Sequence, residues 1–224
     1  MVRIVGHRGA AGIAPENTLD GFARAIEVGV DAVEFDVRRT ADGTLVLLHD
    51  ATVDRTTDGT GRIDDLELAT VQRLDAGGDT TVPTLQAALT FFQDEAVDLH
   101  VDLKTRGVGS SVIDAVQASG LDDRTLLFSS LRDEVEAIAT ADGWTGYSVS
   151  EVTADALSFA TATDVDFVLG PTRADRSAVE RIRAAGMDAG LSTINDPDEL
   201  ERAIGLRPYS VLTDRPDVAV GLLD

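Results

Sequence analysis

The stretch DAVEFDVRRTADGTLVLLHD, residues 31–50, largely decides the fold. Its first part, residues 32–38, alternates between apolar and charged side chains. Because successive side chains of a β-strand point to opposite faces, Glu34, Asp36 and Arg38 are expected on one face and the apolar side chains on the other. The pattern predicts a strand with one face in an apolar core and the other face lined with ionisable groups.

A tight turn interrupts the second part of this stretch. The gap 37–44 is too short for a helix connecting two parallel strands, which takes about a dozen residues. Asp42-Gly43 is typical of the two-residue turn of a β-hairpin. Such a turn pairs residues whose numbers sum to 85, so it predicts that Asp36 lies opposite His49.

Outside this hairpin, short apolar strands alternate with amphipathic helices. The expected strands are 2–5, 32–37, 44–49, 99–103, 125–129, 145–149, 166–169, 189–192 and 210–213. The expected helices run from near Asn17 to Gly29 and over 84–93, 110–118, 132–140, 154–160, 174–184 and 197–204. Repeated βα units predict an α/β fold with a largely parallel sheet.

The fold class expected is a (β/α)8 TIM barrel variant with a hairpin-like second and third strand region. The 224 residues divide into eight units of 28, which is short but sufficient for such a barrel. A doubly wound open sheet is the alternative, and the absence of a Gly-rich phosphate loop after the first strand disfavours it. No linker divides the chain, so we expect a single domain, 1–224, with residues 51–81 as a short capping segment.

Composition excludes several classes of function. Forty acidic and nineteen basic residues give a formal charge of −21, which repels nucleic acid and anionic membranes. Cysteine is absent, which excludes disulfides, thiolate metal sites and cysteine nucleophiles. No apolar run could span a bilayer, and the first residues do not resemble a signal peptide. We therefore expect a cytoplasmic protein without stable membrane insertion.

The acidic residues are interspersed with arginine, whereas Lys104 is the only lysine. An acidic, lysine-poor composition resembles that of proteins from halophiles that accumulate salt. Concentrated salt shortens the screening length to about 3 Å at 1 M, which makes so many carboxylates tolerable. Retention of the single lysine suggests that its position needs a compact cation.

Three histidines lie at or near the ends of predicted strands: His7, His49 and His100. A barrel forms its active site at the carboxyl ends of its strands, which makes His7 and His49 candidates for chemistry. The alternative for each is an ordinary capped or surface histidine. Alternation places His100 inward below Asp102, where we expect it to hydrogen-bond a residue of the site.

Strand alternation also turns three carboxylates inward near the mouth of the barrel: Glu34, Asp36 and Asp102. Unpaired, they would repel one another and lose hydration. One divalent cation with oxygen ligands, Mg²⁺ or Ca²⁺, would solve this problem. Three basic side chains offer the alternative of an ion-pair network: Arg8, Arg38 and Lys104. The pattern leaves both explanations open.

An ordered set of motifs runs over nearly the whole chain. The first half contributes Gly6-His7-Arg8-Gly9, Pro15-Glu16-Asn17-Thr18, Val33-Glu34-Phe35-Asp36-Val37, His49-Asp50, Asp54-Arg55-Thr56-Thr57, Val82-Pro83-Thr84-Leu85 and Val101-Asp102-Leu103-Lys104. The rest contributes Phe128-Ser129-Ser130, Thr193-Ile194-Asn195-Asp196 and Leu212-Thr213-Asp214-Arg215-Pro216-Asp217. Each motif alone is weak, whereas the ordered set is specific. Together these motifs resemble the glycerophosphodiester phosphodiesterase family.

The resemblance implies a TIM-barrel enzyme that hydrolyses a small glycerophosphodiester to a glycerol phosphate and an alcohol. It implies that His7 and His49 are the catalytic acid and base. It also implies one divalent cation on Glu34, Asp36 and Asp102. The residues that it places at the substrate are Arg8 and Lys104, with Glu16 reaching the site from its loop.

The chain departs from the family pattern at two site positions. Asp102 stands where the family usually has glutamate, and Ser192 stands where it usually has tryptophan. A wider pocket at Ser192 leaves one alternative, a lysophospholipase D-like activity on lysolipids. A non-catalytic phosphodiester-binding barrel is a further alternative, which the presence of both motif histidines disfavours. Ordinary structural roles are expected for Asn17 as a helix cap, for Asp214 as a turn or cap residue, and for Trp144 in packing.

Overall fold

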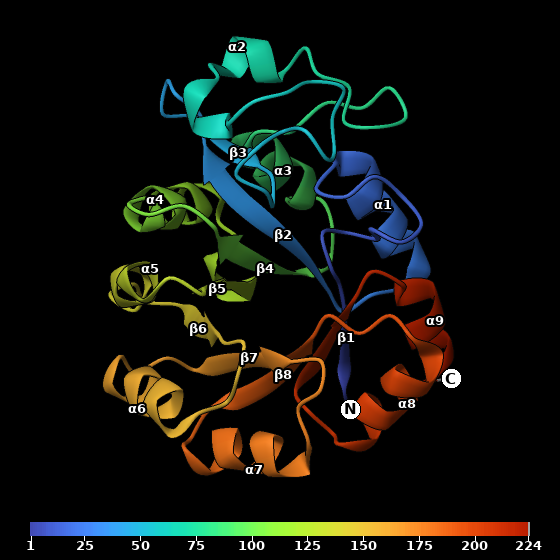
Figure 1. The fold of residues 1–224 in the computed structure, drawn as a ribbon, viewed down its shortest axis with the longest axis vertical. Coiled ribbons are helices and arrows are strands. Elements are labelled where there is room, and N and C mark those ends of the chain that lie inside the picture. The colour runs from blue at the N-terminus through green and yellow to red at the C-terminus, as the bar shows by residue number, and fades with distance from the viewer. Residues whose placement is uncertain (224) are drawn as a thin grey trace.

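The first strand pairs with both the second and the last strand, and this closes the sheet into a barrel. The computed structural model describes residues 1–223 (Figure 1). Eight parallel strands form the barrel: β1 (Arg3–Gly6), β2 (Ala32–Arg39), β4 (Asp98–Leu103), β5 (Thr125–Ser129), β6 (Trp144–Ser148), β7 (Phe167–Pro171), β8 (Asp188–Ser192) and β9 (Ser210–Thr213). The short β3 (Leu45–Leu47) pairs antiparallel with β2, outside the barrel. The predicted (β/α)8 barrel with a hairpin is confirmed.

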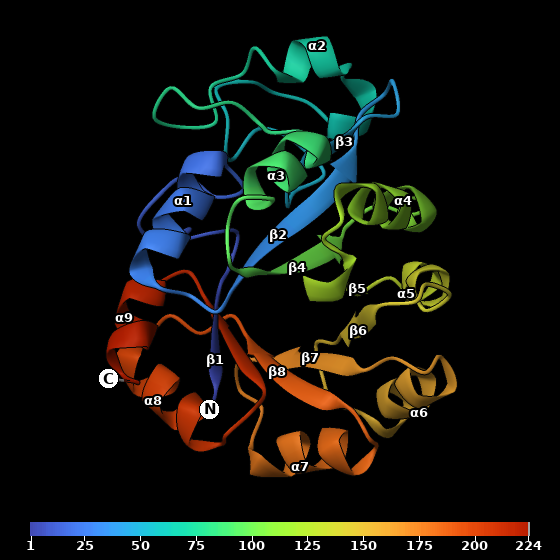
Figure 2. The same cartoon turned by 180° about the vertical axis from the view of Figure 1, so that it is seen from behind.

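Helices surround the barrel, as the two opposite views show (Figures 1 and 2). The helices around the barrel are α1 (Leu19–Val28), α3 (Leu85–Phe92), α4 (Gly109–Ser119), α5 (Arg132–Ile138), α6 (Ala154–Ala162), α7 (Arg176–Ala184), α8 (Pro197–Gly205) and α9 (Pro216–Gly221), whereas α2 (Leu68–Val71) lies in the segment after β3. Two single 3₁₀ turns, η1 (Ile63–Asp65) and η2 (Asp122–Arg124), complete the set. All seven predicted helices are present, whereas the four-residue α2 and the six-residue α9 were too short to be predicted.

Local capping sets where most of these helices begin. Thr18, for example, caps α1, and its hydroxyl oxygen accepts a hydrogen bond from the backbone N–H of Gly21 at 3.0 Å. Gly29 ends the same helix in the left-handed conformation, with φ of 92°. Such caps satisfy backbone groups that the helix itself leaves unpaired.

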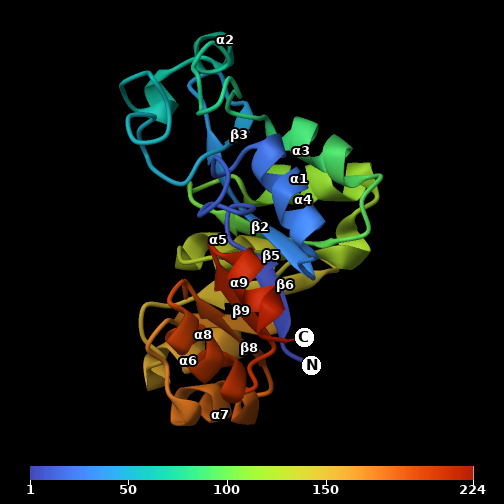
Figure 3. The same cartoon turned by 90° about the vertical axis from the view of Figure 1, so that its right-hand side faces the viewer.

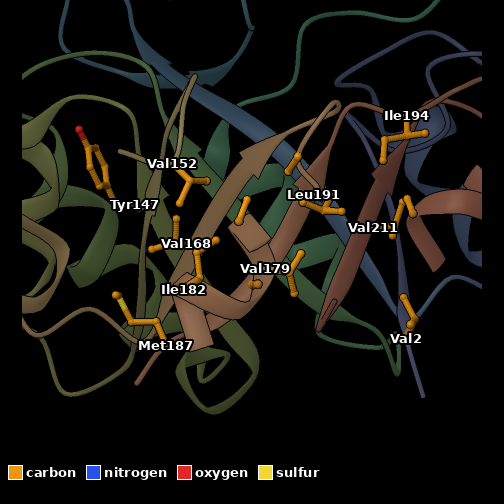
Figure 4. Close-up of a cluster of buried hydrophobic side chains, with 14 of the residues drawn as sticks. Val2, Tyr147, Val152, Val168, Val179, Ile182, Met187, Leu191, Ile194 and Val211 are labelled. Atoms are coloured by element: carbon orange, nitrogen blue, oxygen red, sulfur yellow. The ribbon is translucent and has the colours of Figure 1, made fainter. Parts of the chain in front are cut away.

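The core has an outer layer on each half of the barrel and an inner layer within it. On one half, β6 to β9 pack against α6, α7 and α8 through side chains such as Val168, Ile182 and Leu191 (Figure 4). On the other half, the odd-numbered apolar residues of β2 pack against α1, α3 and α4, as their alternation predicted. Phe128, Phe167 and neighbouring side chains fill the interior. The inner face of β2 is thereby free to carry charge toward the mouth.

The register predicted for the hairpin is wrong by one residue. Val37 pairs with Leu47 and Arg39 with Leu45, so paired residues sum to 84. The loop has three residues, because the backbone N–H of Thr40 donates to the carbonyl oxygen of Thr44 at 2.9 Å. Gly43 occupies the third loop position with φ of 88°, a conformation that costs glycine little. Leu48, not His49, therefore faces Asp36, and its N–H donates to the Asp36 carbonyl at 3.1 Å.

Residues 51–81 stand off the body of the barrel beside β3, where the side view shows α2 at the far end (Figure 3). An apolar cluster of its own fastens this segment to the hairpin: Val46, Leu48, Val53, Ile63, Val71, Ala76 and Val82. The segment contains only η1 and α2 as regular structure. Across residues 1–223, none of the helices combines the length and the apolarity that crossing a bilayer requires.

Candidate active site

The ionisable residues predicted from the sequence meet where the barrel strands end. Adjacent strands β2 and β4 place Asp36 directly beside Asp102. The histidines follow β1 and β3, and the lysine follows β4 at once. The residues brought together are His7, Arg8, Glu34, Asp36, His49, Asp102 and Lys104.

Three buried carboxylates form the centre of this group. Glu34, Asp36 and Asp102 each offer one oxygen, and these oxygens lie within 4.8 Å of one another. Burial and the nearby carboxylate of Asp36 raise the pKa of Glu34 to about 7. Burial also raises the pKa of Asp102 to about 6. At Asp36, by contrast, burial is outweighed by Lys104 and Arg8, which lower its pKa.

Two of the three expected basic partners reach the carboxylates. Lys104 Nζ lies 2.5 Å from Asp102 Oδ2 and 3.2 Å from Asp36 Oδ1, and Arg8 Nε lies 3.2 Å from Asp36 Oδ2. Burial by itself would lower the pKa of Lys104, but Asp102 and Asp36 outweigh burial and raise it. Arg38 turns away, and its guanidinium donates to the backbone oxygens of His49 and Lys104. The ion-pair network thus includes Arg8 and Lys104 but not Arg38.

The carboxylates also fit a cation. Among the described residues, Asp36 Oδ1 and Asp102 Oδ1 are buried and accept no hydrogen bond. Both oxygens belong to side chains of the cluster whose ligand atoms lie within 4.8 Å of one another. Hard divalent cations prefer several carboxylate oxygens gathered in this way. The donor set is therefore suited to Mg²⁺ or Ca²⁺, and the ion pairs with Lys104 do not use all of it.

Each of the two histidines is fixed through its Nδ1 atom. His7 Nδ1 lies 2.6 Å from Asp214 Oδ1, and His49 Nδ1 lies 2.6 Å from Asp50 Oδ1. Burial opposes the charged ring of His7, but Glu34 and Asp214 outweigh burial and raise its pKa. Burial lowers the pKa of His49. Because Nδ1 is occupied in both rings, Nε2 is the atom available to a substrate.

Glu16 reaches the site, as its loop position suggested, but through arginines. Its Oε1 accepts from Arg8 Nη1 at 2.9 Å. Arg55, from the segment 51–81, donates to both oxygens of Glu16 and also to Asp50 Oδ2 at 2.6 Å. These ion pairs join the loop after β1 to the segment after β3.

The expectation that Asn17 caps the first helix is wrong. Thr18 provides the cap, and Asn17 lies one residue earlier with φ of 55°. Its side-chain nitrogen donates to Asp36 Oδ2 at 2.8 Å, and its oxygen accepts from the Asp36 backbone N–H at 3.0 Å. Asn17 therefore orients a carboxylate of the central cluster, as residues behind a metal ligand commonly do.

Two further expectations need correction. His100 does face inward, but neither ring nitrogen hydrogen-bonds any of residues 1–223, and its ring packs edge-to-face against Trp144 and Phe167. Asp214 does not cap the helix that follows, because its carboxylate binds His7 instead. Trp144 packs within the aromatic cluster, as predicted.

Sequence reasoning missed five residues that hold the site in place: Asn17, Asp50, Arg55, Asn195 and Asp214. All five belong to the family-like motifs, which was the available signal. Local roles such as helix capping also explained some of these residues, so their contacts with the site were not predicted. Their partners come from other strands, so only the closed barrel shows what they hold.

Comparisons with known proteins show which family the chain resembles. The family model described as glycerophosphoryl diester phosphodiesterase family matches residues 7–116. A glycerophosphodiester phosphodiesterase of Caldanaerobacter subterraneus subsp. tengcongensis is 35% identical over 146 residues, which cover 58% of this chain and 60% of the relative. The chain thus spans less than two thirds of that relative's own length.

Solved structures match over almost the entire chain. An Oleispira antarctica phosphodiesterase, solved in complex with the product sn-glycerol-3-phosphate, is 28% identical, with a TM-score of 0.90 over 99% of this chain and 96% of its own. A glycerophosphodiester phosphodiesterase from Agrobacterium tumefaciens is 27% identical, with a TM-score of 0.84 over 98% of this chain and 100% of its own. With the motifs at the mouth of the same barrel, these matches show that the chain is similar to members of the glycerophosphoryl diester phosphodiesterase family.

Proposed function

We propose that this protein hydrolyses glycerophosphodiesters to a glycerol phosphate and an alcohol. One observation carries the proposal: His7 and His49, each tied through Nδ1, stand beside the carboxylate cluster and both interact electrostatically with Asp36. Phosphodiester hydrolysis needs a group that takes a proton from the nucleophile and another that gives one to the leaving alkoxide. Two histidines beside a cation-binding cluster provide these groups near neutral pH.

Three carboxylates would hold one divalent cation in this proposal: Glu34, Asp36 and Asp102. When bound there, Mg²⁺ or Ca²⁺ would neutralise the charge of the phosphodiester. Asp36 Oδ1 and Asp102 Oδ1 accept no hydrogen bond, and burial raises the pKa values of Glu34 and Asp102; both observations support this assignment.

Arg8 and Lys104 would bind the phosphate anion. Both side chains are mostly buried at the site, and their exposed fractions of 14% and 19% leave each cation an opening toward a ligand. Asp36, Asp102 and Glu16 hold them in position. An anion arriving here meets guanidinium and ammonium donors that are already oriented, which lowers the entropic cost of binding.

Proton transfer would take place at the Nε2 atoms of His7 and His49. One ring takes a proton from the attacking hydroxyl, which belongs either to water or to the 2-hydroxyl of the substrate glycerol. The other ring gives a proton to the departing alkoxide. Asp214 and Asp50 accept hydrogen bonds from the two Nδ1 atoms, so each ring is left to exchange a proton at Nε2.

The acidic, lysine-poor composition is suited to a protein that functions in concentrated salt. We propose that the protein is located in the cytoplasm of a halophile that accumulates salt. Such a location would supply both the small polar substrates and the ions that screen a formal charge of −21. The assay conditions follow from this: activity is measured in molar KCl.

Glycerophosphodiesters are favoured over lysolipids by the rim of the site. The lysolipid alternative requires an apolar rim, but the leucines and valines of the segment 51–81 pack against one another and the hairpin. Among the described large apolar side chains, only Met1, Ile13 and Leu222 are exposed. Three scattered side chains do not amount to a binding surface for a long acyl chain.

The test is release of glycerol phosphate from glycerophosphocholine and glycerophosphoethanolamine in molar KCl, with Mg²⁺, Ca²⁺ or EDTA. We expect release that EDTA stops and an added cation restores. His7→Ala and His49→Ala are expected to lower kcat by at least about 100-fold. Arg62→Gln, which removes an exposed ion pair with Asp64, is the control. Activity within about tenfold of wild type in either histidine variant would contradict the two-histidine scheme.

A further inference from the structure

The carboxylate of Asp214 lies between a histidine and an asparagine from two other parts of the barrel. His7 Nδ1 is 2.6 Å from its Oδ1, and Asn195 Nδ2 donates to its Oδ2 at 2.6 Å. The same asparagine accepts a hydrogen bond from the backbone N–H of Asp214 at 2.8 Å. Asn195 therefore fixes both the backbone and the side chain of Asp214.

Closure of the barrel creates this contact. Strand β1 pairs with β9 so that Gly6 lies beside Thr213, and the next residues along the two strands are His7 and Asp214. The backbone N–H of His7 donates to the Thr213 carbonyl at 2.9 Å, which continues the ladder to the site. The pairing of the first and last strands thus places His7 next to Asp214.

A structural role does not account for the side chain of Asp214. Helix α9 begins after Arg215 without a side-chain cap, and Asp217 in its first turn pairs with Arg215. The only hydrogen bonds that the Asp214 carboxylate makes with residues 1–223 are those to His7 and Asn195. The His7 ring and the other charges around it lower the pKa of Asp214 despite burial, so the carboxylate is ionised where it meets the ring.

We propose that Asp214, braced by Asn195, is a positioning residue for His7: it accepts the Nδ1 hydrogen and holds the ring so that Nε2 faces the carboxylate cluster. Nε2 lies 3.9 Å from Glu34 Oε2, which shows the direction in which the ring points. A histidine without this partner could turn about its side-chain bonds or carry its proton on Nε2 instead. The effect of Asp214 on catalysis rests on the proposed function. Its effect on the orientation and protonation of the His7 ring does not.

The state of the ring is read directly from the ¹⁵N spectrum of the imidazoles. The chain has only three histidines, so variants of His49 and His100 assign the signals. At alkaline pH, where a histidine ring is neutral, we expect His7 of the wild type to carry its proton on Nδ1. Asp214→Asn removes the charge but keeps the shape, and is expected to shift part of the population to the Nε2–H form.

Asp217→Asn is the matched control, because Asp217 lies three residues further on and is similarly exposed, at 34% against 26%. It should leave the His7 signals unchanged. An unchanged His7 tautomer in Asp214→Asn would overturn the proposal. A shift in that variant supports it whether or not the wild type hydrolyses a glycerophosphodiester, so failure of the proposed function remains a separate result.

Kinetics provide the second readout, with thermal melts to verify that each variant is folded. Asp214→Asn and Asp214→Ala are expected to lower kcat by about 100-fold, as loss of a group that orients a catalytic side chain does. KM should stay within about threefold, because Asp214 does not touch the substrate in this scheme. Asp214→Glu should restore part of kcat. Wild-type kcat in the folded Asp214→Ala variant would contradict the proposal.

Discussion

The guanidinium of Arg55 holds the carboxylate of Glu16 through both terminal nitrogens, at 2.6 and 2.8 Å. Its third nitrogen, Nε, donates to Asp50 Oδ2 at 2.6 Å. Glu16 in turn holds Arg8, and Asp50 holds His49. One arginine of the segment 51–81 therefore stabilises two groups that the proposed reaction uses.

Replacing this arginine should impair both groups together. In Arg55→Gln we expect kcat to fall about tenfold through His49 and KM to rise through Arg8, effects typical of residues that support a functional side chain. Arg55→Lys should restore little of the lost kcat, because one ammonium group cannot make the hydrogen bonds that three guanidinium nitrogens make. Steady-state kinetics with Arg62→Gln as the control within the same segment test this. Equal kcat and KM values for Arg55→Gln and the control would show that the ion pairs of Arg55 do not support the site.

The strands and helices could be predicted because they follow from local patterns. Alternation in β2 identified its apolar face, and Gly29 marked the end of α1. The hairpin register depends on finer detail: Asp42-Gly43 suits a two-residue turn, yet the Thr40 hydroxyl bonds to Asp42 and the chain forms a three-residue loop. A difference of one loop residue shifts every pair along the hairpin.

The core of the site was predictable, whereas its supports were not. Side-chain alternation and the positions of the strand ends are enough to predict that Glu34, Asp36 and Asp102 meet at the mouth of the barrel. Asn17 and Asp214 each had an adequate local explanation as a cap. Their actual partners lie 19 and 207 residues away along the chain. Such pairings depend on which strands become neighbours when the barrel closes. A local sequence pattern does not show which strands these are.

Cation binding at the three carboxylates can be tested without measuring turnover. A ligand that binds the folded state raises its melting temperature, so Mg²⁺ or Ca²⁺ should raise that of the wild type. Asp102→Asn removes one charge from the cluster and should weaken cation affinity by about 10- to 100-fold in calorimetry. Asp114→Asn, on the exposed face of α4, is the charge-matched control. Equal affinity in both variants would place the cation elsewhere.

The stability of the protein should rise with salt. Forty acidic residues exceed nineteen basic ones, so at least 40 − 19 = 21 carboxylates have no cation of their own. Their mutual repulsion extends over about 10 Å at 0.1 M salt and about 3 Å at 1 M. The midpoint of urea unfolding is therefore expected to increase with KCl and with NaCl alike, but much less with sucrose. A midpoint that falls with KCl would mean that ion pairs such as Arg62–Asp64 outweigh the repulsion.

Acid should destabilise the protein through His100. Burial lowers the pKa of this histidine from 6.5 to about 3. Between these values the unfolded chain binds a proton that the folded one does not, so stability falls as the pH falls below 6.5. The slope is about 1.4 kcal/mol per pH unit for one such group.

His100→Leu removes this group while keeping the position apolar between Trp144 and Phe167. Its free energy of unfolding should therefore depend less steeply on pH than that of the wild type, by about 1.4 kcal/mol per unit between about pH 6 and pH 4. Urea unfolding of both proteins in molar KCl measures the difference, and all other titrating groups cancel in it. Parallel pH profiles would mean that the folded barrel accommodates a charged His100, against the burial of its ring among aromatic side chains.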